Sequence, residues 1–320
     1  MPSSRTTVRA VVAAILLGVG VALGIAGLFP SYLGGASLAG EPAELVPHAI
    51  YLAAWAASGL LILLGGARPR AGALLGIGTA VVTFGLFFAD AGLVMAGSAH
   101  LGAGLVLSLA SWLGCAAGSA LALLIRPATP ASAPVRPQGR ELAPIITMIL
   151  AGLGAAIAFA PSWDSYTLRT SADFTQSLTA GNAFANPAPV MAGDVAVMAA
   201  VVAVVIAAGM WRQVRYGAAL LVGVIIPMAA QAISALVQLA QPASPTQFGI
   251  SPAQATQLGL TITSGLTLAF WIFCAFVLAL VLSAARMLIT PDADGLEGGP
   301  GQVTALRRVA ARDSGALPRH

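Results

Sequence analysis

The chain has 320 residues, of which 58% are hydrophobic and only 8% are charged, with a formal net charge of +4. Soluble domains carry roughly 25% charged residues, so this composition excludes a soluble globular protein. The arginines are scattered through short turns rather than gathered on one face, which does not indicate a nucleic-acid partner. Apolar runs of about 20 residues match the thickness of a bilayer and predict an all-α, polytopic membrane protein.

The first half of the chain, residues 1–125, contains four predicted membrane helices. The basic leader that precedes the first run also suits a signal peptide, but we expect a retained helix because a similar run recurs later in the chain. Pro47 suits the first turn of the second helix. The predicted ranges are 10–29, 48–67, 71–96 and 102–125.

Residues 126–141 contain four prolines and predict an extended linker that divides the chain in two. The second half, residues 142–286, again contains four predicted helices. Their ranges are 142–160, 194–211, 216–240 and 258–286, with loops at 164–193 and 241–257. The polar tail, residues 287–320, predicts a disordered segment. An amphipathic helix at 302–312 that lies on the inner leaflet is the alternative.

Three short matches recur in the same order in both halves. The basic turn that ends at Arg70 resembles the one that ends at Arg215, and both run into similar apolar text. Pro30-Ser31-Tyr32 resembles Pro161-Ser162-Trp163, and Trp112 to Cys115 resembles Trp271 to Cys274. These matches predict two tandem four-helix repeats. Because each repeat has an even number of helices, both repeats should have the same orientation in the membrane.

Arginine also predicts the topology of the chain. With eight crossings, every arginine except Arg169 falls on the side that holds the leader, the basic turns, the linker and the tail. The positive-inside rule places this side in the cytoplasm. We therefore expect a protein of the plasma membrane, the bacterial inner membrane, with both termini cytoplasmic.

No catalytic, cofactor-binding or metal-binding motif is present in the sequence. The glycine pairs Gly20–Gly24, Gly72–Gly76 and Gly114–Gly118 have the spacing that permits close helix packing. We predict no cofactor. Trp112 and Trp271 are predicted to be paired packing positions, with Cys115 and Cys274 one turn further on.

Polar residues on two predicted helices mark the first candidate site. The third helix carries Thr79, Thr83 and Asp90 on one face, and the seventh carries Gln231, Ser234 and Gln238 on nearly the matching face. Pro227 predicts a kink in the seventh helix. These features predict an outward vestibule between the third and seventh helices that Asp90 and Gln231 both face. The alternative for Asp90 is a solvated carboxylate at the membrane interface.

A second candidate is a cluster of Glu44, His48 and His100 with Asp90 at the outer face, which would handle a metal ion or protons. Pro47 disfavours helix at the residue before it, so Glu44 and His48 are not expected to pair one helical turn apart. Two unrelated interfacial histidines are the alternative.

Three functions remain open on the sequence. The first is a non-enzymatic scaffold or accessory subunit that works in the lipid bilayer with other membrane subunits or as a homo-oligomer. The second is a transporter or channel that uses the predicted vestibule, although the lack of a charge near mid-membrane argues against proton or sodium coupling. The third is an enzyme that acts on lipid-linked substrates, for which Asp90, His48 and His100 are the candidate residues.

Overall fold

The computed structural model describes residues 4–66, 68–125, 142–172, 174–179, 182–211 and 213–289, with side chains from residue 8 onward. The predicted linker at 126–141 lies outside these residues. So does the predicted tail from residue 290.

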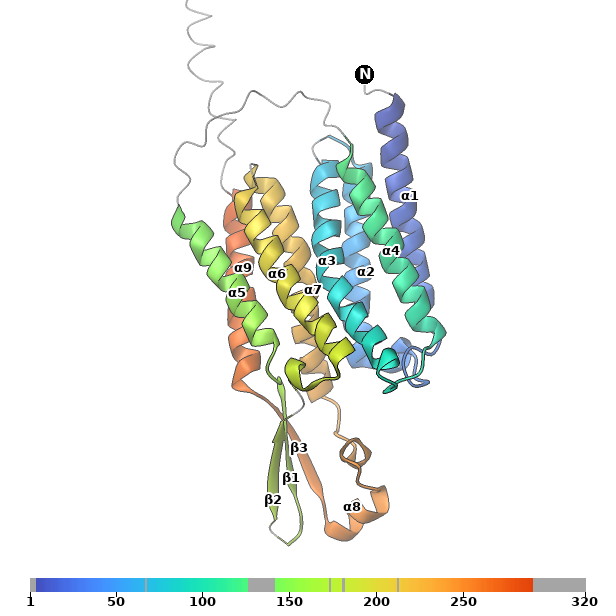
Figure 1. Ribbon diagram of the computed structural model, residues 1–320, viewed down its shortest axis with the longest axis vertical. Helices are drawn as coiled ribbons and strands as arrows, with labels where there is room; N and C mark the ends of the chain where they lie inside the picture. Colours follow the sequence, from blue (N-terminus) through green and yellow to red (C-terminus); the bar gives the residue numbers. More distant parts are fainter. Residues whose placement is uncertain are drawn as a thin grey trace, which may run out of the picture.

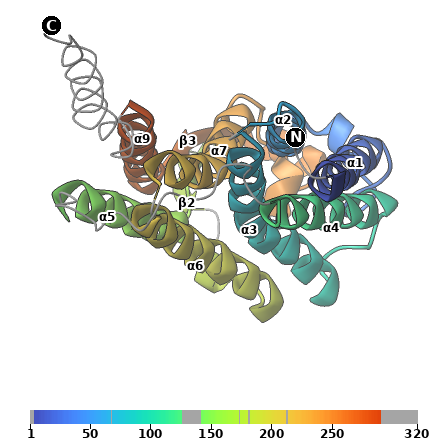
Figure 2. The same cartoon turned by 90° about the horizontal axis from the view of Figure 1, so that it is seen from above.

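Eight of the described helices are long and apolar enough to cross a membrane, the number that the sequence predicts. They support a multi-pass membrane protein. Their bounds are α1 Ser4–Gly27, α2 Pro42–Leu63, α3 Arg68–Met95, α4 Ala103–Leu123, α5 Leu142–Phe159, α6 Ala188–Met210, α7 Val214–Leu239 and α9 Leu268–Ile289. The eight helices form one bundle, with α1 and α4 at one side and α5 and α9 at the other (Figures 1 and 2).

The four most extensive helix contacts within α1–α4 have counterparts among the helices of the second half. The pairs α1·α2, α1·α4, α2·α3 and α3·α4 correspond to α5·α6, α5·α9, α6·α7 and α7·α9. Between the halves, α3 packs on α6, and the corresponding contact is that of α7 on α2. The equivalent helices α3 and α7 also pack on each other. A Cβ atom added to Gly78 of α3 would lie 2.5 Å from the carbonyl oxygen of Leu220 and 3.0 Å from the Cα atom of Gly223. Glycine therefore lets the backbones of α3 and α7 meet.

Glycine also sets the α1–α4 contact. A Cβ atom on Gly20 would lie 2.9 Å from both the amide nitrogen of Cys115 and the carbonyl oxygen of Ser111, and one on Gly118 would lie 2.8 Å from the carbonyl oxygen of Ala13. The prediction that these glycines permit close packing is confirmed.

A three-stranded antiparallel sheet projects from one end of the bundle, which we call the sheet end (Figure 1). It consists of β1 Asp164–Arg169, β2 Thr175–Thr179 and β3 Thr261–Leu266, in the order β2-β1-β3. The short helices η3 Pro245–Phe248 and α8 Pro252–Leu258 lie before β3. The predicted all-α architecture is confirmed for the bundle. The plain loops predicted at 164–193 and 241–257 are wrong, because the first contains β1 and β2 and the second contains η3 and most of α8.

Several predicted helix boundaries are also wrong. α2 begins at Pro42 and contains Pro47, and α3 begins at Arg68, so the basic turn is its first turn. α6 begins at Ala188, inside the predicted loop. The last helix begins at Leu268 rather than 258, because α8 ends at the left-handed Gly259 (φ 53°) and the chain then enters β3. It runs to Ile289, past the predicted boundary of the second half at 286.

The two tryptophans predicted as paired packing positions differ in burial. Trp112 is partly buried, and its indole nitrogen donates to the carbonyl oxygen of Ala80 over 2.9 Å. Trp271 is 58% exposed, so the prediction of a packing role is wrong for it. Cys115 is buried, and Cys274 is half-buried.

Candidate functional site

The sheet end of α2 and α3 holds a cluster of hydrogen-bonded side chains around Tyr32. The Tyr32 hydroxyl donates to Oδ2 of Asp90 over 2.7 Å, and Nε2 of His48 lies 3.3 Å from the same hydroxyl. The His48 ring packs edge-on against Tyr32 and Phe87, with centroid distances of 5.3 and 5.6 Å. We call Tyr32, His48 and Asp90 the Tyr32 cluster.

Tyr32 belongs to the segment between α1 and α2 and is only 4% exposed. Burial, and next the charge of Asp90, raise the pKa of its hydroxyl well above the usual value near 10. The phenol is therefore neutral at physiological pH and acts as the hydrogen donor to Asp90. No candidate site predicted from the sequence included Tyr32, although the match of Pro30-Ser31-Tyr32 with Pro161-Ser162-Trp163 contains it.

Glu44 and His48 lie one turn apart in α2, and Nδ1 of His48 lies 2.7 Å from the carbonyl oxygen of Glu44. The expectation that Pro47 prevents helix before it is therefore wrong, but the contact of His48 is with the backbone of Glu44 and not with its carboxylate. Pro47 remains inside the helix because its missing N–H leaves only one carbonyl, that of Ala43, without its helical partner. Ser234 of α7 donates to this carbonyl over 2.5 Å.

A second contact joins the halves one turn further along. Nε2 of Gln231 in α7 donates to the hydroxyl of Tyr51 in α2 over 2.6 Å. Tyr51 is 2% exposed, and its ring lies 5.9 Å from that of His48. Gln231 and Ser234 therefore face the first half of the protein, and Tyr51 lies between Gln231 and the Tyr32 cluster.

The two predicted vestibule threonines lie in packed surroundings. Thr79 and Thr83 are 0% exposed, and their hydroxyls donate to carbonyl oxygens one turn back in α3, those of Leu75 (3.1 Å) and Thr79 (2.8 Å). Buried hydroxyls whose bonding is complete within their own helix pack against neighbours and do not line an open space. The interface between α3 and α7 is thus closed at this level.

The remaining predicted residues lie apart from the Tyr32 cluster. Gln238 lies in the last turn of α7, the helix that contacts β3. His100 is exposed in the segment between α3 and α4. Pro227 is buried inside α7, one turn from Gly223, whose carbonyl it leaves without a helical donor. The kink stays a prediction.

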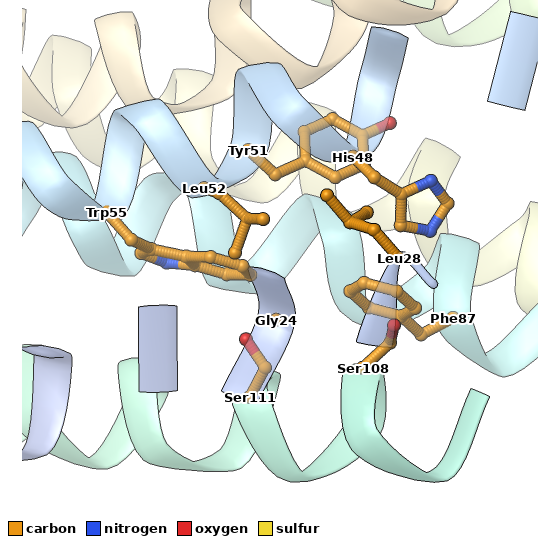
Figure 3. Close-up of a pocket in the computed structure, with 9 residues that line it drawn as sticks. All are labelled: Gly24, Leu28, His48, Tyr51, Leu52, Trp55, Phe87, Ser108 and Ser111. Carbon is orange, nitrogen blue, oxygen red and sulfur yellow. The ribbon is translucent and has the colours of Figure 1, made fainter. Parts of the chain in front are cut away.

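A small cavity lies beside the Tyr32 cluster (Figure 3). Its volume is about 10 Å³, which is room for one water molecule and not for a substrate. Its wall includes Ser111, which is 2% exposed and whose hydroxyl has no hydrogen-bond partner among the described residues. The lining residues are Gly24, Leu28, His48, Tyr51, Leu52, Trp55, Phe87, Ser108 and Ser111.

A larger pocket of about 220 Å³ opens at the sheet end of the second half, and we call it the sheet-end pocket. Gln231 is the one predicted vestibule residue that lines it. Its lining residues are Phe159, Ala160, Pro161, Ser162, Trp163, Asp164, Ala183, Asn186, Asp194 and Gln231. The open space therefore lies among α5, α6, α7 and the start of β1, rather than between α3 and α7. Asp164 and Asp194 were not among the candidate residues that the sequence indicated.

Among the described residues, no three or more His, Cys, Asp or Glu side chains are grouped so that they could hold a metal ion. The Tyr32 cluster joins neutral and acidic side chains by hydrogen bonds. The sheet-end pocket is open and has polar side chains in its wall. No known family model, no curated protein and no solved structure matches this chain.

Proposed function

We propose that this protein is a non-enzymatic scaffold or accessory subunit of an assembly in the bacterial plasma membrane, with other membrane subunits or further copies of itself as partners. The observation that carries this proposal is the sheet at the end of the bundle. It stands beyond the membrane-spanning helices (Figure 1), where it is accessible to a partner on the same side.

The edges of the sheet suit strand addition. Within the described residues, β2 and β3 each pair on one side only, with β1. β2 has the sequence Thr-Gln-Ser-Leu-Thr, and most of its residues are exposed. Proteins usually block exposed edges with charges or proline, and β2 has neither. An extended segment of a partner can therefore add to this edge by backbone hydrogen bonds.

Two further proposals concern architecture. We propose that the two halves are tandem repeats of the same orientation, related by an axis along the membrane normal. The matched helix contacts support this proposal. So do Gly78 and Gly223, which meet at the centre and stand eight positions after Arg70 and Arg215 respectively. Equivalent residues meet in this way on a twofold axis.

The proposed orientation places the sheet outside the cell and both termini in the cytoplasm. Arg68 and Arg215 lie at the ends of α3 and α7 that are remote from the sheet, whereas Arg169 is in β1. The positive-inside rule then assigns the sheet end to the outer side. A reporter fused at Asn182 should behave as extracytoplasmic, and a cytoplasmic signal would contradict the topology.

The scaffold proposal is tested on the edge of β2. We expect wild-type protein, purified in mild detergent, to retain a stoichiometric partner that quantitative mass spectrometry detects. Lysines at Gln176 and Ser177 should reduce its recovery at least tenfold, because edge charges oppose strand addition. Gln257→Lys adds one lysine on the exposed face of α8 and serves as the control. Recovery of no partner with the wild type, or equal recovery with the edge variant, would overturn the proposal.

Transport through an outward pocket is the second candidate, favoured by the volume of the sheet-end pocket and by Gln231 in its wall. Alanine at Asp90 and at Gln231 separates the two functions. Loss of uptake of a solute while the partner is retained would support transport, whereas loss of the partner alone would support the scaffold. The third function, an enzyme acting on lipid-linked substrates, has less support because the cavity beside the Tyr32 cluster holds only about 10 Å³.

A further inference from the structure

We propose that the sheet-end pocket binds a small organic cation that carries a primary ammonium group. This proposal goes beyond the scaffold function and does not depend on it. The inference rests on the oxygen acceptors, the aromatic wall and the volume of the pocket.

Three side chains on three different elements present oxygen acceptors to the pocket. Asp194 of α6 is held by Asn186, whose Nδ2 donates to Oδ2 over 3.0 Å. Gln231 of α7 uses its Nε2 to hold Tyr51, so its Oε1 is left as an acceptor. No described residue donates to the carboxylate of Asp164, the first residue of β1. A primary ammonium has three N–H donors, which matches these three acceptors.

Part of the pocket wall is aromatic and fixed in position. The indole nitrogen of Trp163 donates to the carbonyl oxygen of Ala158 over 2.9 Å, and the Trp163 ring lies 4.4 Å from that of Phe273. Phe159 packs edge-on against Trp163 with a centroid distance of 5.7 Å and also lines the pocket. Such rings accept the apolar carbons of a ligand and attract a cation to their faces.

Hydrogen bonds also fix the backbone around the pocket. The amide of Ala183 donates to the carbonyl oxygen of Ala160 over 2.8 Å, and the hydroxyl of Thr267 donates to the carbonyl oxygen of Ser162 over 2.7 Å. These bonds fix the end of α5 against η2 (Ala183–Ala185) and against the end of β3. The pocket is thus already shaped before a ligand enters, which lowers the cost of binding.

The charge of the pocket selects a cation. Two carboxylates line it and no arginine does. Partial burial raises the pKa of Asp164, and a bound cation would offset this loss of hydration. A bare divalent metal ion fits less well, because such ions need more oxygen ligands than two carboxylates supply and the described residues offer no third acidic or histidine ligand here. The volume of about 220 Å³ instead suits a small organic molecule.

Two kinds of ligand could supply the primary ammonium group, a free amine or the headgroup of phosphatidylethanolamine. The full-length protein in detergent is titrated calorimetrically with ethanolamine, and separately with short-chain phosphatidylethanolamine. Ethylene glycol and short-chain phosphatidylcholine are the controls without a primary ammonium. We expect saturable binding of at least one of the two amines. Which amine binds identifies the source.

Asp164→Asn and Asp194→Asn keep the shape of each side chain and remove its charge. Each should weaken binding of the amine at least tenfold. Glu41→Gln alters an exposed acid outside the pocket and should leave binding unchanged. Thermal melts without ligand identify variants that fail to fold. If Asp194→Asn fails to fold, Asn186→Ala replaces it, because this variant removes the hydrogen bond that holds the Asp194 carboxylate. Binding of neither amine, equal binding of the controls, or affinities unaffected in both Asn variants would overturn the proposal.

Discussion

The two halves of the bundle have the same helix contacts but different interiors. Apart from tyrosine, every buried polar side chain among the described residues lies in α2, α3 or α4, and these are His48, Ser58, Thr79, Thr83, Ser108, Ser111 and Ser119. In the second half, a cluster of rings from Phe159, Trp163, Phe270 and Phe273 packs beside a core of aliphatic side chains. The matched positions Tyr32 and Trp163 show the contrast. Tyr32 donates to the carboxylate of Asp90, whereas Trp163 packs among three phenylalanines.

The same arrangement of helices is therefore compatible with different kinds of buried side chain, hydroxyl groups in the first half and aromatic rings in the second. Close helix approach in the first half comes from glycines, which let hydroxyls reach backbone carbonyls, as Ser58 does with Gly72 over 2.7 Å. In the second half, a cluster of large rings packs between α5 and α9. The four predictions below test this contrast, in order of expected effect.

The largest effect is expected in the second half. Phe273 is fully buried and touches the rings of Trp163 and Phe159, so Phe273→Ala should cost roughly 3–5 kcal/mol through the lost contacts and the cavity left behind. Thermal unfolding in detergent measures the loss. Trp271→Ala removes a larger but exposed ring two positions away and should change stability little. Equal losses for both variants would mean that the aromatic cluster does not support this half.

The first half should be most sensitive to added volume. Gly20→Leu forces a side chain against the backbone of α4 and should cost about 1–3 kcal/mol. Gly18→Leu is the matched control, since a Cβ atom there meets nothing within 4 Å. A folded Gly20→Leu protein with unchanged thermal stability would show that glycine does not set the α1–α4 distance.

The Tyr32 cluster predicts a pH-dependent effect. Tyr32→Phe leaves Asp90 without its donor and should cost about 1–3 kcal/mol at neutral pH. Because the pKa of Tyr32 is higher in the folded than in the unfolded chain, its contribution is complete below the unfolded value near 10 and is lost as the pH rises through the folded value. The stability difference between wild type and variant should therefore shrink above about pH 10. A difference that stays constant would contradict the assignment.

The smallest effects concern two neighbouring serines and should have opposite signs. Ser58→Ala loses a hydrogen bond to Gly72 and should cost about 1 kcal/mol. The Ser119 hydroxyl is buried without a partner among the described residues, so Ser119→Ala should be neutral or stabilising by up to about 1 kcal/mol. Thermal melts of the two variants measured side by side give the comparison. A larger loss for Ser119→Ala would indicate that a water molecule serves its hydroxyl.

Much of the bundle is predictable because apolar length alone identifies membrane spans. The eight spans were found in this way. The sheet was missed, although Asp164-Ser-Tyr-Thr-Leu-Arg169 alternates polar and apolar residues with the period of a strand. The pairing of β1 with β3 joins Arg169 to Thr261, and a contact between segments so distant in the sequence leaves no local pattern.

The candidate site was predicted only in part, for a similar reason. Helical spacing placed Asp90 and Gln231 on polar faces, but it did not identify the side chains that meet them. Tyr32 comes from a loop and Tyr51 from the apolar face of another helix. Pro47 was taken as a helix start because a proline inside a helix leaves a carbonyl unpaired. No pattern in the sequence indicated that Ser234 would donate to that carbonyl.

The bond between Ser234 and Ala43 also bears on how the protein is made. It joins residues 191 positions apart, and the Gln231–Tyr51 bond beside it spans 180 positions. During synthesis, α2 enters the membrane long before α7 leaves the ribosome. Until then the Ala43 carbonyl and the Tyr51 hydroxyl lack these donors, so α2 reaches its final hydrogen bonding only when the seventh span arrives. Maturation of the first half is thereby tied to completion of the second.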